Sequence, residues 1–288
     1  MHLTLLELAT LRNELIWIYD HEPGSLTMKA NRAPEGGNWA WYLRAGELQL
    51  TQGERITTLH PGQWVLLPEG SAEHRFTPDS QLLSIHYRCQ WPTGDNLIHV
   101  NAPVIIATEQ HSSLLKRATR LARFHAYNFS PTGTYKTFRR EQADYSNFLQ
   151  LQIHFFAWLK EWTDALSVND ANWTYFKSED ERLLTAFRIL NQAPLKKGLP
   201  RDQLQVVTQL SIVQLNRLFV RELGLTISKY WDRRRLEQAC ESLHDQSISI
   251  KELGFLLGFR SDSLFVNWFT RRKGVSPGRF RDKIANNV

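Results

Sequence analysis

The sequence predicts an α+β multidomain protein, with a barrel or sandwich of short strands in its N-terminal part and an all-α C-terminal part. Three observations predict this class. Short β-branched and aromatic runs ending at Gly, Pro or Asp succeed one another between about residues 16 and 100. Helical periodicity replaces them after about residue 108, and a helical unit occurs twice near the C-terminus. A chain of 288 residues has room for two domains and a connector.

The N-terminal region, residues 1–108, is expected to form an arm followed by the strands. The predicted strands are ELIWIYD, WAWYLRAG, ELQLTQG, ERITTLHPGQWVLLPEG and QLLSIHYRC. Several of them alternate with a period of two, which is typical of strands with one buried face. Many short strands separated by turn residues predict a small barrel or sandwich.

A helical connector is predicted over residues 109–167, and a polar linker, VNDANWTYFK, follows over 168–177. The segment after Thr137 repeats apolar side chains at spacings of three and four, with Gln152 at a polar position, and so resembles a three-repeat heptad seam. This seam either packs onto the strands of its own subunit or forms a homodimer interface, and the sequence leaves both alternatives open. The candidate interface residues are Leu114, Ala118, Leu121, Tyr145, Phe148, Phe155, Leu159 and Trp162.

Residues 178–288 are expected to be helical throughout, because helix-start signals recur along them. Ser178 with Glu181, Ser211 with Gln214, and Ser249 with Glu252 have the spacing of a capping box. The Ser276–Pro277 pair marks another helix start, since proline at the first helical position loses no needed hydrogen bond.

An internal repeat lies within this helical region. SIVQLNRLFVRELG starts at Ser211 and SDSLFVNWFTRRKG starts at Ser261, 50 residues later. Both segments have a bulky apolar residue four positions after the serine, a phenylalanine after eight and a glycine after thirteen. A short helical stretch precedes each copy, and TISKYWDRRRLEQACESL joins the copies as one helix. The repeated unit is therefore a helix, a tight turn and an amphipathic helix that stops at glycine.

Charge and composition narrow the function classes. Residues 178–288 carry a net charge of +7 and the remainder −1, which indicates a polyanionic partner for the helical region. No stretch approaches the roughly 18 apolar residues of a membrane span, and charges interrupt the apolar N-terminus, so we expect neither membrane contact nor a secretory signal. Cys89 and Cys240 stand far apart without metal-ligand or redox spacing, which fits a reduced cytoplasmic protein without a cofactor.

The helical region resembles the AraC/XylS family of transcription regulators over roughly residues 178 to 285. The matching text is LNRLFVRELGLTISKYWDRRRLEQACESL and IKELGFLLGFRSDSLFVNWFTRRKGVSPGRFR. The resemblance implies two helix-turn-helix units, sequence-specific binding of double-stranded DNA, and RNA polymerase as a further candidate partner. Three positions depart from the family pattern. Gln209 replaces the turn glycine of the first unit and must adopt a left-handed backbone unless the turn is built differently. Gly254 replaces a common alanine, and Asn267 stands where arginine is frequent.

Roles on DNA follow from which side chains the core leaves outside, because a recognition helix offers only its outward face to the major groove. We expect the first unit, through Arg217, to carry more sequence discrimination than the second. The two recognition helices should lie about 34 Å apart, one DNA turn. The expected base-reading residues are Val213, Gln214, Asn216, Arg217, Ser263, Leu264, Val266 and Asn267. The expected phosphate contacts are Ser211, Arg260, Ser261, Arg271, Arg272, Lys273, Arg279 and Arg281.

The strand region resembles the cupin-like effector-binding barrel that often precedes this DNA-binding domain, through GQWVLLPEG and the following Glu73 and His74. Trp39 and Trp41 stand where metal-binding cupins carry an HxH pair, so no metal is expected. The resemblance implies a small-molecule effector, for which a carbohydrate is the predicted class. The candidate effector contacts are Trp17, Tyr42, Arg44, His74 and His86.

Two alternatives concern this same barrel. It either binds a protein partner or binds no effector at all. An enzymatic barrel would need a catalytic pair such as Glu69 or Glu73 with His74, yet the sequence supplies no nucleophile or metal beside them. We therefore expect no enzyme activity.

Overall fold

The computed structural model describes residues 4–23, 29–32, 37–68, 72–129, 142–169, 171–174, 180–243 and 245–286. The chain divides into two compact units. A sheet unit comprises Arg12–Gln90 and Asp95–Tyr175, so the predicted connector helices belong to the same unit as the strands. A helical unit comprises Met1–Leu11, Trp91–Gly94 and Phe176–Val288. The α+β class is as predicted.

The sheet unit contains two larger antiparallel sheets and one two-stranded sheet within the described part of the chain. Five strands pair in the order β1 (Arg12–His21), β8 (Gln81–Gln90), β3 (Asn38–Ala45), β6 (Gln63–Leu66) and β10 (Val104–Ala107). Four strands pair in the order β2 (Lys29–Arg32), β7 (Ala72–Phe76), β4 (Leu48–Gln52) and β5 (Arg55–Leu59). The short strands β9 (Ile98–His99) and β11 (Asn172–Trp173) pair separately.

The core of this unit joins residues from both sheets. Trp41 and Leu43 of β3 are buried, and they cluster with Leu48, Leu50, Leu59, Val65, Phe76 and Leu82. Because successive side chains of a strand point to opposite faces, Trp39 and Trp41 share the inner face while Tyr42 lies on the other one. The period-two pattern of WAWYLR therefore corresponds to an inter-sheet face and a helix-covered face.

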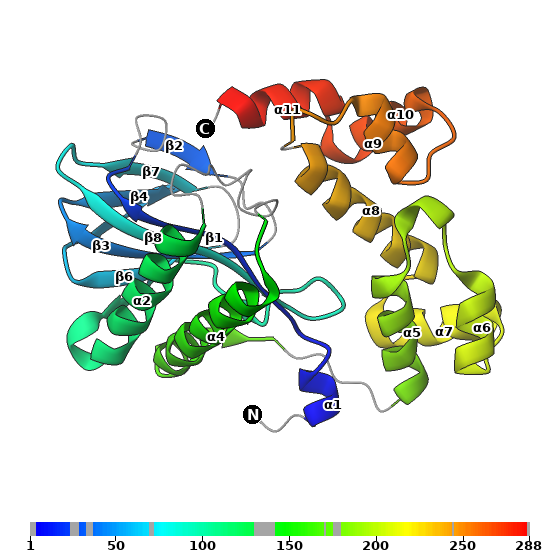
Figure 1. Cartoon of the computed structure of the whole chain (residues 1–288), viewed down its shortest axis with the longest axis horizontal. Helices are drawn as coiled ribbons and strands as arrows, with labels where there is room; N and C mark the ends of the chain where they lie inside the picture. The colour runs from blue at the N-terminus through cyan, green and yellow to red at the C-terminus, as the bar shows by residue number, and fades with distance from the viewer. Residues whose placement is uncertain are drawn as a thin grey trace. The chain divides into compact units, whose positions relative to one another are not determined.

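Helices α2 (Ser112–Asn128) and α4 (Tyr145–Ser167) cover the outer face of the five-stranded sheet (Figure 1). Trp64 lies between Tyr42 and Trp162, with ring centroids 5.1 and 5.6 Å apart. The Trp162 Nε1 donates to the Tyr87 hydroxyl at 2.7 Å in a buried hydrogen bond. A short helix, α1 (Leu5–Leu8), and a 3₁₀ turn, η1 (Thr108–Gln110), precede β1 and α2 respectively.

The heptad seam of the connector helices is used for packing inside this unit. Six of the eight candidate interface residues are buried there, namely Leu114, Ala118, Leu121, Phe155, Leu159 and Trp162. Tyr145 and Phe148 alone of that set stay exposed, at 74% and 46%. The same helix α4 also exposes Leu149, Ile153 and Phe156. The alternative in which the seam packs onto its own strands therefore describes these six residues.

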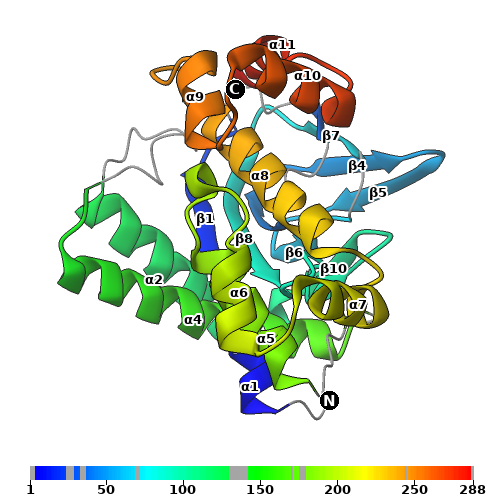
Figure 2. The ribbon, with the colours of Figure 1, turned by 90° about the vertical axis from the view of Figure 1, so that its right-hand side faces the viewer.

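The helical unit consists of short helices in two similar groups. The first repeat contains α5 (Glu181–Gln192), the 3₁₀ turn η2 (Leu195–Lys197), α6 (Arg201–Thr208) and α7 (Ile212–Leu223). The second repeat contains α9 (Ile250–Leu256), α10 (Asp262–Lys273) and α11 (Pro277–Asn286). Helix α8 (Ile227–Leu243) runs between the two repeats (Figures 1 and 2). Within the described residues, no helix is long and apolar enough to span a bilayer.

Local sequence signals explain the helix boundaries. Ser211 and Gln214 form the predicted capping box, and the Ser249 and Ser261 side chains accept from the first turns of α9 and α10. Gly224 and Gly274 end α7 and α10 in the left-handed conformation. At α5 the cap is Asp180, and the predicted start at Ser178 lies outside the described residues.

Candidate nucleic-acid interface

The two helix-turn-helix units bury equivalent positions. Leu215 and Phe219 of α7 are fully buried, as are Phe265 and Phe269 of α10. Spacings of four on a helix put these side chains on one face, so the opposite face of each helix is left to solvent. Both candidate recognition helices therefore present an outward face.

The turns before the two recognition helices differ. Gln209 follows α6 with φ 56° and ψ 25°, which is the left-handed conformation expected if glutamine replaces the turn glycine. Its Nε2 donates to the Val206 carbonyl at 2.7 Å. In the second repeat Gly258 has φ 80°, and a Cβ there would lie 2.8 Å from the Leu195 carbonyl oxygen. Glutamine is tolerated at the first turn because its side chain is exposed, whereas the second turn lacks room for any side chain.

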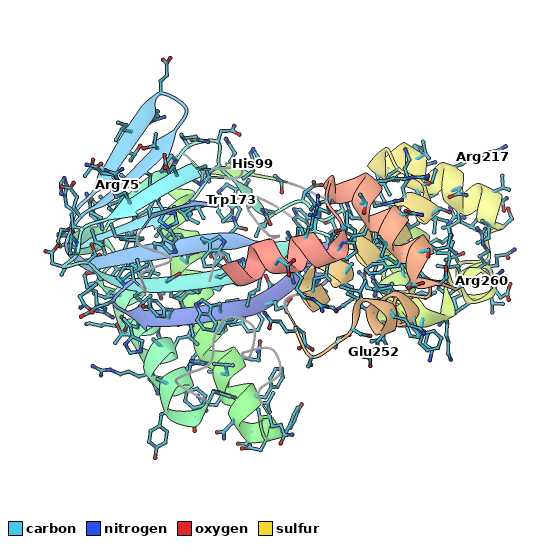
Figure 3. All side chains as sticks on the ribbon, turned by 90° about the horizontal axis from the view of Figure 1, so that it is seen from above. Arg75, His99, Trp173, Arg217, Glu252 and Arg260 are labelled. Atoms are coloured by element: carbon cyan, nitrogen blue, oxygen red, sulfur yellow. The ribbon has the colours of Figure 1, made fainter. Side chains whose placement is uncertain are left out.

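The outward face of α7 is built around Val213 and Arg217. Val213 is 60% exposed, and Arg217 is exposed one turn later. Figure 3 shows Arg217 at the outer edge of the helical unit. The other two expected readers have structural contacts: the Gln214 Oε1 accepts from Ser211, and the Asn216 Oδ1 accepts from the Ile227 amide at 3.1 Å.

The outward face of α10 is less polar. Leu264 is 55% exposed, and Ser263 and Asn267 are exposed beside it, while Val266 is half-buried. The four expected readers of this helix therefore lie on or next to its solvent face. Their chemistry offers one amide, one hydroxyl and an apolar contact, without a cation.

The expected phosphate contacts fall into two groups. Arg260, Arg271 and Arg279 are exposed, and Figure 3 shows Arg260 at the outer edge of the unit. The exposed Lys273 Nζ lies 5.6 Å from the centroid of the Phe280 ring. The Arg272 Nε donates to Asp232 at 2.8 Å, and the Arg281 Nη2 donates to the Ile248 carbonyl at 2.8 Å. The hydroxyls of Ser211 and Ser261 cap their helices.

Sequence reasoning missed an apolar pair that precedes the turn in each repeat. Val206 and Val207 lie in the last turn of α6, and Phe255 and Leu256 end α9, all with exposed side chains. Two adjacent residues of a helix point in different directions, so they cannot both lie on the inward face that Leu204 or Leu253 defines. Two adjacent apolar residues in the sequence could therefore have predicted that at least one of them is exposed.

The expected effector contacts divide between two faces of the five-stranded sheet. Trp17 and Trp39 both pair with His86 across neighbouring strands, and the rings of Trp39 and His86 stack at 3.8 Å. Residues directly opposite each other in antiparallel strands share a face. The buried His74 ring lies 5.1 Å from the Trp41 ring in the same inter-sheet layer.

Tyr42 and Arg44 lie on the opposite, helix-covered face. The Arg44 Nε donates to Asp20 at 2.8 Å, and its Nη2 donates to the Thr119 hydroxyl of α2 at 3.1 Å. The five expected effector contacts therefore do not line one cavity, because strand alternation separates Tyr42 and Arg44 from the inter-sheet group.

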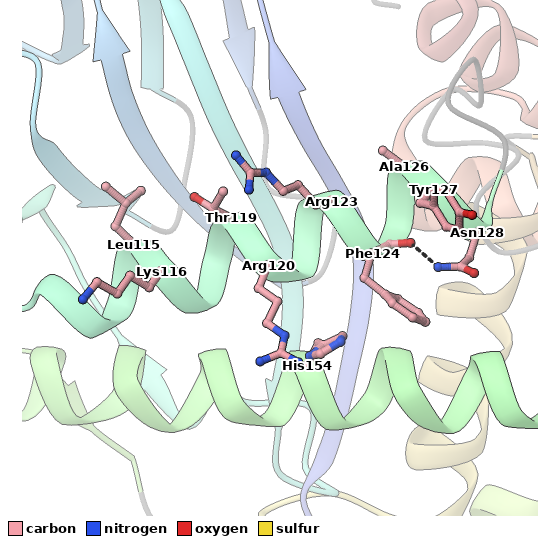
Figure 4. A pocket seen from close by; sticks show the side chains of 10 residues that line it. All are labelled: Leu115, Lys116, Thr119, Arg120, Arg123, Phe124, Ala126, Tyr127, Asn128 and His154. Carbon is pink, nitrogen blue, oxygen red and sulfur yellow. Dashed lines mark hydrogen bonds between the residues drawn. The ribbon is translucent and has the colours of Figure 1, made fainter.

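An open groove of about 1140 Å³ lies along α2, beside His154 of α4 (Figure 4). Three cations, Lys116, Arg120 and Arg123, line it together with Phe124 and Tyr127. Burial, followed by Arg120 and Arg117, lowers the pKa of His154. None of the expected effector contacts lines this groove. The described residues contain no group of three or more His, Cys, Asp or Glu side chains that could hold a metal ion.

Comparisons with known proteins agree on the C-terminal region. A family model described as a helix-turn-helix domain matches residues 206–283. A probable transcription factor of Proteus vulgaris, PqrA, is 29% identical over 91 residues, which cover 32% of this chain and 75% of that protein. An uncharacterized HTH-type transcriptional regulator of Bacillus subtilis, YfiF, is 32% identical over 99 residues, covering 34% of this chain and 31% of that protein. The chain thus matches three quarters of the first relative's length but only a third of the second's.

A solved structure from Chromobacterium violaceum, a transcriptional regulator with an AraC-type DNA-binding domain, is 29% identical. The match covers 36% of this chain and 91% of the Chromobacterium violaceum chain, with a TM-score of 0.33. The matched residues contain both candidate recognition helices, α7 and α10, and the helix that joins them. Residues 206–283 therefore match a helix-turn-helix domain, and over this region the chain is similar to proteins named as transcription regulators.

Proposed function

We propose that the chain regulates transcription in the cytoplasm by inserting α7 and α10 into successive major-groove segments of a double-stranded operator. The observation that carries this proposal is the duplicated recognition helix, whose outward face stays exposed in both repeats while the equivalent inner positions are buried. Exposed arginines at 260, 271 and 279 supply positive charge around the second repeat. We also propose RNA polymerase as a protein partner on promoter DNA.

Within this proposal, α7 discriminates between bases more strongly than α10. Arg217 can bind guanine bidentately, and Val213, one turn earlier on the same face, can contact a thymine methyl group. On α10 the exposed Leu264 can make only an apolar contact of that kind. Asn216 is the weaker candidate reader, because its Oδ1 already accepts from the Ile227 amide.

Selection from a randomised duplex library tests this division of roles. Arg217→Ala should relax base preference at one operator position, at a cost of about 1–3 kcal/mol for the preferred base. Arg271→Ala, the matched control, should weaken all sequences about equally. If the purified wild-type protein enriches no sequence and shows no salt-dependent affinity for duplex DNA, the proposed function is wrong.

We propose the inter-sheet layer of the sheet unit as the effector site, with a carbohydrate as the predicted ligand class. Aromatic rings of Trp17 and Trp39 suit sugar C–H groups, and the imidazoles of His74 and His86 suit hydroxyls. Glu73 is exposed while the adjacent His74 is buried, which does not support a catalytic pair between them, and Glu69 lies outside the described residues.

A thermal-shift screen of sugars, with carboxylates and phosphate esters as a second set, tests this site. A sugar that stabilises the wild-type protein but not Trp39→Ala supports the inter-sheet site. Stabilisation by anionic ligands alone, lost in Arg120→Ala, would favour the cationic groove on α2 instead. The absence of any stabilising small molecule favours the alternatives in which the barrel binds a protein partner or no effector.

We also propose a homodimer, formed through the exposed face of α4 rather than through the buried heptad seam. Leu149, Ile153 and Phe156 lie on that face at spacings of four and three, continuing from Tyr145. A repeated apolar stripe of this kind is the pattern of a helix–helix seam. Ile153→Glu should shift the protein to monomer in sedimentation experiments, whereas Ser167→Glu, near the end of the same helix, should not. A dimer unaffected by Ile153→Glu would contradict this interface.

A further inference from the structure

Besides the Ile227 amide, which donates to Asn216 of α7, helix α8 contacts the end of α5 through two residues that are four positions apart. The Tyr230 hydroxyl donates to the Asn191 Oδ1 at 2.8 Å, and its ring lies 5.1 Å from Phe187. Arg234 donates to the Leu190 carbonyl and, at 2.8 Å, to the Asn191 carbonyl. Both carbonyls belong to the last turn of α5, where a helix leaves such groups without internal partners. Tyr230 and Arg234 therefore dock the C-terminal end of α5.

The same stretch of α8 contacts the second repeat through two other residues. Asp232 accepts from the Trp268 Nε1 at 2.7 Å and also from Arg272. The Arg235 Nε donates to the carbonyl of Leu257, the C-cap of α9, at 2.9 Å. Its guanidinium carbon lies 3.8 Å from the centroid of the Phe259 ring in the second turn.

These four residues fall within one and a half turns of a single helix. Tyr230 and Arg234 share one face because they are four apart, and Asp232 and Arg235 share another because they are three apart. Beyond them, Leu236, Ala239 and Leu243 continue into the core of the second repeat. The two repeats are thus attached to different faces of the same rigid rod, not to opposite ends of a flexible linker.

A second joint connects the repeats independently of α8. The turn η2 of the first repeat packs against the turn of the second, with Leu195 in the second repeat's core cluster. A Cβ on Gly258 would lie 2.8 Å from the Leu195 carbonyl oxygen and 3.2 Å from that of Lys196. The Lys196 Nζ lies 4.1 Å from the centroid of the exposed Phe255 ring. The backbone of the second repeat at Gly258 lies directly against the backbone of the first repeat at Leu195 and Lys196. The two repeats therefore have little freedom to move relative to one another at this joint.

We infer that Asp232 and Arg235, together with the joint at Gly258, are positioning residues that hold α7 and α10 at one relative placement and thereby restrict the operator to a single half-site spacing. This inference rests on the proposed function, since spacing matters only on DNA. One inserted base pair rotates a half-site by about 34–36° around the duplex and moves it about 3.4 Å along it. Two helices fixed to one rod cannot follow that change, whereas two tethered helices can.

The experiment is selection by the full-length chain from a duplex library with 30 randomised base pairs. For the wild-type protein we expect a two-part motif with one gap length, and about a tenfold or greater loss of affinity when one base pair is added to or removed from that gap. Arg235→Met removes the contacts to α9 and its turn, and we expect it to broaden the gap distribution and to reduce the one-base-pair penalty to about two- or threefold.

Lys229→Met is the matched control. Lys229 is exposed on the same helix, so this substitution removes one positive charge from α8, as Arg235→Met does, without removing a contact to α9 or its turn. We expect it to weaken binding without broadening the gap distribution, which separates positioning from the loss of a positive charge. Asp232→Asn keeps an acceptor for Trp268 but removes the charge facing Arg272; it should broaden the distribution partially and serves as the deciding variant if Arg235→Met fails to fold.

The outcomes separate the two claims. If Arg235→Met and Asp232→Asn keep the wild-type gap and its penalty, or if Lys229→Met broadens the gap equally, the positioning role is overturned while DNA binding stands. If the wild-type protein already selects half-sites with variable gaps, the rigid coupling itself is wrong. If it enriches no motif, the proposed function fails rather than the inference about α8.

Discussion

The left-handed glutamine at the first turn offers a direct test of how the two repeats differ. Gln209 has φ 56°, a conformation that costs a non-glycine residue about 1–2 kcal/mol because its Cβ crowds the following carbonyl oxygen. Glycine has no Cβ and avoids this cost. We therefore predict that Gln209→Gly stabilises the folded protein.

The net magnitude is smaller than the relief of strain alone. The substitution loses the exposed hydrogen bond from the Gln209 Nε2 to the Val206 carbonyl, a loss of about 0.5 kcal/mol. It also loosens the unfolded chain, which costs about another 0.4–1 kcal/mol. With midpoints of about 1.5, 0.5 and 0.7 kcal/mol, subtracting both losses from the strain relief leaves a gain of about 0.3 kcal/mol in the free energy of unfolding.

The reverse substitution in the second repeat sharpens the comparison. Gly258→Gln would impose left-handed strain at φ 80° and would place a Cβ 2.8 Å from the Leu195 carbonyl oxygen. The strain of about 1–2 kcal/mol and the overpacking of about 1–3 kcal/mol both destabilise this variant. The two glycine–glutamine exchanges should therefore differ by roughly 4 kcal/mol and have opposite signs.

Calorimetric unfolding of the full chain measures the sign and the size of each effect. Hydrogen exchange of the amides in α6–α7 and in α9–α10 then assigns each change to its repeat. A lower unfolding free energy for Gln209→Gly would refute the strain argument at the first turn. A Gly258→Gln variant as stable as the wild type would refute the steric argument at the second, and with it the close joint between the repeats.

Three further predictions concern charge, pH and burial. Arg271→Ala and Arg279→Ala should each lower the slope of log affinity against log salt by about 0.9 on nonspecific duplex DNA, because each phosphate contact releases counterions. Anisotropy titrations at several salt concentrations measure this slope. An unchanged slope would argue against the phosphate contact. Burial lowers the pKa of His125 from 6.5 to about 4, so the folded state excludes a proton that the unfolded state takes up. The stability contributed by the neutral imidazole is present above pH 6.5 and declines as the pH falls toward 4, by about 2 kcal/mol at pH 5. In urea denaturation at pH 7 and pH 5, the free energy of unfolding should depend less on pH for His125→Phe than for the wild type. An equal pH dependence of the two proteins would contradict this role of His125. Tyr87→Phe removes the acceptor of the buried Trp162 Nε1 and should lower the free energy of unfolding by about 1–3 kcal/mol without changing the sedimentation coefficient. A change in oligomeric state would instead mean that Trp162 belongs to a subunit interface.

Features that depend on residues close in sequence were predictable. The capping serines, the glycine stops and the inward phenylalanines of both repeats follow from spacings of three and four, and the structure confirms them. The left-handed backbone at Gln209 followed from a missing glycine at a turn. Such signals are local, because one helical turn contains both the residue and the group that it satisfies.

Features that depend on distant partners were decided by tertiary structure. The spacing of the α4 seam is compatible with a sheet or a second subunit, and the rings of Trp64 and Tyr87 determine that Trp162 is buried within its own unit. In the sequence Asn216 belongs to the outer face of α7, whereas in the structure its Oδ1 accepts a hydrogen bond from the backbone amide of Ile227 in the next helix. The sequence shows that a side chain needs a partner but not which one.

Local patterns along the chain are enough to predict strands followed by helices, a helix-turn-helix that occurs twice, and an excess of positive charge in the helical region. The fold was needed to show that Trp39 and His86 share the inter-sheet face while Tyr42 and Arg44 lie on the helix-covered face, and that Asp232 and Arg235 connect α8 to the second repeat. Periodicity specifies the two faces of an element, whereas the inner face and its contacts are set by the non-local packing that buries most apolar surface.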